Sequence, residues 1–101
     1  MVIDMSYKKA QILKTNTNRG MQFIAFSEDV LDHVDNYTVL QYGDAPNDMV
    51  ETWTSTHVIN QMQKYLKRME NNGRGEEDNL LSCKKLAHYA CILNQKLREG
   101  K

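Results

Sequence analysis

Two apolar patterns with helical spacing, separated by a polar hinge, occupy the second half of the chain and constrain its fold most. The first pattern places six apolar side chains on one face of a helix: Val58, Ile59, Met62, Tyr65, Leu66 and Met69. Thr54 or Ser55 is a suitable N-cap, and the hinge at residues 71–75 supplies asparagine and glycine to end the helix. The spacing therefore predicts a helix that begins just after Thr54 or Ser55 and ends at the hinge.

The second pattern predicts a final helix that begins near Glu76. Its acidic first turn, residues 76–78, and the basic residues Lys96 and Arg98 near its end both suit the helix dipole. Residues 86–93 are almost wholly apolar, which is typical of a helix that has neighbours on several sides. We expect the two helices to pack together and to bury Val58, Ile59, Met62, Leu66, Leu86, Ala90 and Leu93 between them.

The N-terminal part of the chain predicts a β-hairpin. Residues 7–14 and 21–26 are short strand-like runs. The separator at residues 15–20 is rich in turn formers, and Gly20 can supply a positive φ there. Because an isolated hairpin is only marginally stable, this hairpin must pack on the helices.

A third helix is expected between the hairpin and the two long helices. Ser27 resembles an N-cap, and apolar residues then recur at helical spacing as far as Tyr42. Residues 37–42 also have strand propensity, so a third strand is the alternative for that run. The predicted fold class is α+β, mainly α-helical, with about three helices and an N-terminal β-hairpin.

Composition excludes several classes of protein. A chain of 101 residues fits one small domain, residues 1–101, with a modest core. The 13 basic and 13 acidic residues balance, whereas a dedicated nucleic-acid binder usually has a basic excess. No apolar run approaches the length of a membrane span, and the first residues do not resemble a secretory signal. We therefore expect neither nucleic acid nor a membrane as a partner.

The two cysteines bear on the compartment. Cys83 and Cys91 are eight residues apart on the predicted final helix. That spacing is about 12 Å along the helix axis, which is too far for an intrahelical disulfide. The simplest interpretation is two small buried thiols in a reduced, cytoplasmic protein.

One helix face could bind phosphate. His57, Gln61, Lys64 and Arg68 share one side of the first long helix, and Arg74 follows in the hinge. We call Lys64, Arg68 and Arg74 the basic face, because lysine and arginine offer phosphate both charge and directed donors. A solvated outer surface is the commoner role of such a face.

Carboxylates and histidines offer two further possibilities. Glu77 and Asp78 could hold Mg²⁺ beside a bound phosphate, although stabilisation of the helix start already explains both. His57 and His88 could act as a general acid or base near neutral pH, but structural histidines are commoner. No recognisable nucleophile accompanies them, so the sequence leaves open whether the chain is an enzyme.

The second half of the chain also carries a pattern of short motifs: Trp53, then Lys64-Tyr65-Leu66-Lys67-Arg68, then Glu77-Asp78 leading to Leu80, Lys84-Lys85 and Tyr89. It resembles a family of small phage-encoded proteins described as nucleotide kinase-like or uncharacterised. The likeness covers residues 53–97, and Asn60-Gln61 stand where the family has Gly-Asn. The resemblance implies a phage origin and a nucleotide ligand.

Two functional hypotheses follow. In the first, the protein binds or acts on a nucleotide through the basic face, with Mg²⁺ as cofactor only in that case. In the alternative, it is a noncatalytic interaction module or structural homodimer, which binds itself or a host protein through Trp53, Tyr37 and Tyr42. A net charge of zero favours the second, because nothing repels self-association.

Overall fold

The computed structural model describes residues 14–45, 48–71 and 74–101. About 82% of this described part is helical, and no strand occurs in it. The elements in chain order are α2 (Asn18–His33), the π-helical turn η1 (Val34–Thr38), α3 (Val39–Tyr42), the 3₁₀ turn η2 (Met49–Thr52), α4 (Ser55–Glu70) and α5 (Glu76–Glu99). None of these helices is both long enough and apolar enough to cross a membrane.

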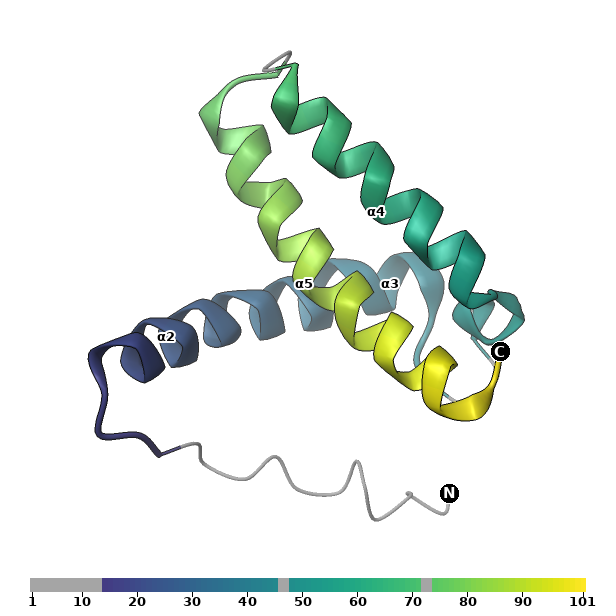
Figure 1. Ribbon diagram of the computed structural model, residues 1–101, viewed down its shortest axis with the longest axis horizontal. Coiled ribbons are helices and arrows are strands. Elements are labelled where there is room, and N and C mark those ends of the chain that lie inside the picture. The colour runs from purple at the N-terminus through teal and green to yellow at the C-terminus, as the bar shows by residue number, and fades with distance from the viewer. Residues whose placement is uncertain (1–13, 46–47, 72–73) are drawn as a thin grey trace.

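Helix α5 is the centre of the arrangement. It packs along α4, and the rod formed by α2, η1 and α3 crosses behind it in the view of Figure 1. A helix with neighbours on two sides matches the broad apolar segment that the sequence shows at residues 86–93.

Local signals explain why α4 and α5 begin and end where they do. Thr54 caps α4, since its hydroxyl accepts a hydrogen bond from the backbone N–H of His57 at 3.1 Å. Helix α5 follows Gly75, whose φ is +86°, and ends at Gly100 in the left-handed region. Both long helices predicted from the sequence are therefore confirmed.

The predicted N-terminal β-hairpin is wrong, and the fold is all-α rather than α+β. Residues 21–26, expected as the second strand, lie inside α2, while residues 7–13 of the first expected strand lie outside the described residues. Thr17 caps α2 by accepting a hydrogen bond from the backbone N–H of Gly20 at 2.9 Å. Threonine and asparagine favour helix N-termini as much as turns, so the separator is a helix start.

The helix that follows the expected hairpin therefore begins at Asn18 and not at Ser27. The Ser27 hydroxyl instead donates to the carbonyl of Ile24 at 2.8 Å, within the helix. Residues 37–42 are helical, so the alternative of a third strand is excluded. The rod ends at Gly43, whose φ of +91° is a conformation that glycine adopts readily.

The core is small. Its buried hydrophobic residues in the described part of the chain are Val58, Tyr89 and Ile92. Half-buried residues pack against them: Val50, Trp53, Met62, Tyr65 and Leu93. The core thus lies where η2, α4 and α5 meet.

The predicted core is confirmed only in part. Val58 is fully buried, and Met62, Leu86 and Leu93 are half-buried. Ile59, Leu66 and Ala90 are exposed. Ile59 and Leu66 lie roughly 80–100° around α4 from Val58, and a single neighbouring helix covers too narrow a stripe to reach them.

The cysteines also differ from the expectation. Cys83 and Cys91 are free, but both are exposed on α5 rather than buried. The buried line of α5 runs through Ser82, Tyr89 and Lys96, and both cysteines lie well around the helix from it.

Candidate functional site

Five rings from four segments of the chain gather beside the core, and we call them the aromatic cluster: Tyr42, Trp53, His57, Tyr65 and Tyr89. The ring centroid of Trp53 lies 4.9 Å from that of His57, 5.5 Å from Tyr42 and 6.1 Å from Tyr89. Tyr65 lies 5.7 Å from Tyr89. These are the centroid separations at which aromatic pairs attract one another.

A cleft of about 230 Å³ opens beside this cluster, and we call it the aromatic cleft. Aromatic side chains form much of its wall: Tyr37, Tyr42, Trp53, Tyr65 and Tyr89. Lys85, His33 and His88 also line it, and no carboxylate of the described residues does. The lining therefore combines aromatic rings with the ammonium group of Lys85 and the imidazoles of His33 and His88.

Cations flank one ring of the cluster. The guanidinium of Arg68 lies 5.1 Å from the ring centroid of Tyr65, and the Lys85 ammonium lies 5.3 Å from the same centroid. Both distances are within the range of a cation–π interaction. Arg68 is thus drawn toward the cluster, away from the outer surface.

Burial and neighbouring charge alter the titration of the groups along the cleft. Burial lowers the pKa of His33, with a further lowering from the positive charges of Lys85 and Lys84. The pKa of His88 is lowered by burial and by His33, and Asp48 opposes this shift. Burial also raises the pKa of Tyr89, as do the hydroxyls of Tyr65 and Tyr42. At neutral pH the cleft therefore contains the neutral imidazoles of His33 and His88 and the protonated phenol of Tyr89.

These histidines predict a pH dependence of stability. Because the folded-state pKa values of His33 and His88 lie below 6.5, the unfolded chain binds more protons just below that pH. The free energy of unfolding should fall as pH drops through 6.5 and level off below the folded-state pKa values. Urea titrations at about pH 7.5 and 5.5 measure this loss, and a His33→Gln/His88→Gln variant should reduce it. An equal loss of stability between these pH values in the double variant would contradict the assignment of the pH dependence to His33 and His88.

The structure does not gather the basic face around a cavity. Lys64 and Arg74 are exposed, Arg68 lies over Tyr65, and none of the three lines either cleft described in this section. Such a face can still bind a ligand at the surface, but nothing encloses that ligand.

The other predicted site residues are scattered. Glu77 is exposed and Asp78 half-buried in the first turn of α5, and the described residues contain no cluster of three or more metal-ligating side chains. His57 packs on Trp53, whereas His88 lines the aromatic cleft.

Of the three aromatic residues predicted to form an interaction surface, only one is well exposed. Tyr37 is 68% exposed and stacks on His33 at a centroid distance of 5.3 Å. Trp53 and Tyr42 are half-buried in the aromatic cluster. The three do line one cleft together.

Sequence reasoning missed three residues of the site. Lys85 entered only through the family resemblance, and His33 was not singled out because nothing local marks it. Lys96 was read as a dipole partner at the end of its helix. Its 5% exposure, however, makes it a buried lysine.

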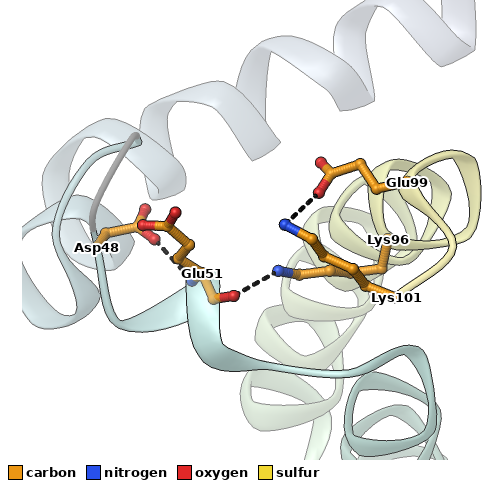
Figure 2. A network of polar contacts seen from close by, with 5 residues as sticks. All are labelled: Asp48, Glu51, Lys96, Glu99 and Lys101. Carbon is orange, nitrogen blue, oxygen red and sulfur yellow. Dashed lines mark hydrogen bonds and ion pairs between the residues drawn. The ribbon is translucent and has the colours of Figure 1, made fainter.

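Lys96 ties the end of α5 to η2 (Figure 2). Its ammonium donates a hydrogen bond to the carbonyl of Glu51 at 3.1 Å, and Asp48 accepts one from the backbone N–H of Glu51 at 3.1 Å. Lys101 and Glu99 form an exposed ion pair at 3.0 Å nearby. These residues line a second cleft of about 280 Å³, which shares Thr38, Tyr42, His88 and Ile92 with the aromatic cleft.

The fold and these clefts define a small all-α protein with a ring-lined cleft on its central helix. Comparisons with protein-family models, with curated proteins and with solved structures gave no match. The resemblance to phage-encoded nucleotide kinase-like proteins therefore stays a prediction, and function must be argued from the structure.

Proposed function

We propose that this protein is a noncatalytic interaction module that forms a homodimer through α2. The observation that carries the proposal is the exposed apolar surface of that helix. Met21 is 56% exposed, Phe23 63% and Leu31 54%. Phe23 lies on the same face of α2 as the half-buried Ser27 and Val30, one turn nearer the N-terminus. Phe23 and Leu31 lie roughly 80° apart around α2, so they can share one exposed apolar surface, and a surface of this kind marks an interaction site more often than a solvated face.

Charge on α2 favours a second copy of the chain as the partner. Arg19 is its only lysine or arginine and lies at its N-terminal end, while Glu28, Asp29 and Asp32 lie in its second half. In an antiparallel pair of α2 helices, the basic end of each helix lies beside the acidic half of the other. A twofold arrangement is the commonest form of homo-oligomer and uses the same surface twice.

Sedimentation equilibrium over a range of protein concentrations tests this proposal. The wild type is expected to show a concentration-dependent dimer, and Phe23→Glu should shift it to monomer, because the new carboxylate loses water on pairing. Gln22→Glu is the matched control. It adds the same charge at the adjacent exposed position, roughly 100° around α2 from Phe23 and on the opposite side from Leu31, and it should leave the dimer intact.

Two results would contradict the homodimer. One is a wild-type protein that stays monomeric at every concentration. The other is an equal loss of dimer in both variants, which would show a nonspecific effect of charge. Arg19→Glu provides a further check, since it should weaken the dimer more at low salt than at high salt.

Nucleotide binding at the basic face stays a second prediction, supported by the motif resemblance and by the side-by-side positions of Lys64 and Arg68 on α4. We also propose a cytoplasmic location, supported by two cysteines that are unpaired. The dimer proposal depends on neither of them.

A further inference from the structure

The aromatic cleft differs from the rest of the molecule in its charge. The chain has 13 acidic residues, yet no carboxylate of the described part lines this cleft, while Lys85, His33 and His88 do. Lys85 forms no ion pair within the described part of the chain, and its ammonium rests over the ring of Tyr65. An unpaired cation beside a carboxylate-free cleft favours a negatively charged ligand.

The size and walls of the cleft restrict that ligand further. Its volume of about 230 Å³ is below the roughly 300–1,000 Å³ of pockets that hold drug-sized molecules, which leaves room for a single ring. Tyr37 stacks on His33 with an interplanar angle of 15°, although the tyrosine ring is mostly exposed. Exposed rings held in a fixed orientation suit the binding of a planar partner.

We propose that the aromatic cleft binds a small aromatic anion, one ring bearing an oxyanion group, with the ring among the tyrosines and the oxyanion beside Lys85. The site lies where residues 33–42 of the α2–α3 rod meet Trp53, Tyr65 and α5. The exposed apolar residues Phe23 and Leu31 of α2 and the exposed residues Lys64 and Arg74 of the basic face do not line it.

The charges around the two histidines make binding sensitive to pH. The charges of Lys84 and Lys85 on α5 oppose protonation of His33, whereas Asp32 favours it. Protonation of His88 is opposed by His33 and favoured by Asp48. A bound anion offsets the positive charges and stabilises both imidazolium forms. Binding should therefore take up protons, so the affinity should rise as pH falls between about 8 and 5, wherever the protein remains folded.

Fluorescence of Trp53, the single tryptophan, reports binding because its ring lines the cleft. Benzenesulfonate is a suitable probe, since its charge is constant over this pH range. It is expected to change the emission in a saturable way and to bind more tightly at low pH. Cyclohexanesulfonate, which lacks a π face, should bind about two- to tenfold more weakly. Phenol, which lacks the charge, should bind more weakly as well.

A pair of lysine variants locates the site. Lys85→Met keeps the apolar stem but removes the charge, and it should weaken benzenesulfonate binding by about ten- to a hundredfold. Lys64→Met makes the same change at an exposed residue that lines neither cleft, and it should leave the affinity unchanged. Circular dichroism checks that both variants are folded.

Three outcomes would overturn the proposal. The first is the absence of a saturable response to benzenesulfonate at millimolar concentration. The second is equal affinity for benzenesulfonate and cyclohexanesulfonate, which would leave the rings without a role. The third is a loss of binding in Lys64→Met but not in Lys85→Met, which would place the anion on the basic face. Neither the dimer nor its test is affected by any of these results.

Discussion

Replacing Tyr89 with alanine is expected to lower the free energy of unfolding by about 3–5 kcal/mol, the usual cost of deleting a buried aromatic ring. Tyr89 is only 7% exposed and is one of the few buried hydrophobic residues of the described chain. Its ring contacts both Trp53 and Tyr65, so the alanine leaves a cavity at the centre of the aromatic cluster. Urea denaturation, with the slope checked for constancy, measures the loss.

Two control variants separate the ring of Tyr89 from other effects. Tyr89→Phe keeps the ring and removes only the hydroxyl, so it should cost about 0.5–1.5 kcal/mol. Leu66→Ala removes a side chain that is 52% exposed, so its cost should be well below that of Tyr89→Ala. Equal losses in Tyr89→Ala and Leu66→Ala would show that the core lies elsewhere.

The second large loss of stability is expected from Val58→Asp. Val58 has an exposed fraction of 0% and belongs to the hydrophobic core with Tyr89 and Ile92, so the substitution places a charge among apolar side chains. An uncompensated buried charge costs on the order of 3–5 kcal/mol. In a domain of this size, each kcal/mol lowers Tm by about 4–8 °C, so the melting curve should shift markedly.

Ile59→Asp is the matched control for this experiment. It makes a similar change at the next residue of α4, where the side chain is 41% exposed and the carboxylate can stay in water. Its melting temperature should remain close to that of the wild type. If Ile59→Asp lowered Tm more than Val58→Asp, Ile59 would be buried, as the hydropathy pattern predicts. The buried face of α4 would then differ from the one in the structure.

The long helices could be predicted because several local signals agree in them. Thr54, the apolar period of residues 58–69 and the hinge near Gly75 all indicate the same boundaries for α4 and α5. The start of α2 was misread because Thr17 and its neighbours favour a turn and a helix N-cap equally. The hydrogen bond from the backbone N–H of Gly20 to the Thr17 hydroxyl shows that the chain adopts the helix N-cap.

The buried line of α5 was missed for a different reason. It includes Ser82 and Lys96, which are 2% and 5% exposed and which hydropathy assigns to the surface. The lysine is tolerated there because its ammonium donates a hydrogen bond to the backbone carbonyl of Glu51. Glu51 lies 45 residues away in the sequence, so no local sequence pattern indicates this contact.

The aromatic cleft could be predicted only in its parts. Trp53, Tyr42 and Tyr37 were recognised as candidates, but they were expected to face solvent. His33 and Lys85 become neighbours because the α2–α3 rod crosses α5, and the angle of that crossing depends on packing. The chemistry of the cleft is therefore a property of the crossing and not of any single motif.

The π-helical turn at Val34–Thr38 bears on how this chain can vary in evolution. Such a turn holds one residue more than an α-helical turn, so losing one residue there restores a regular helix and leaves both flanks in register. Asn36 is exposed, and its amide bonds to Asp32 within the same helix, so the loss of Asn36 disturbs no packing. Homologous chains one residue shorter are expected to have their gap at this turn, with His33 and Tyr42 still aligned.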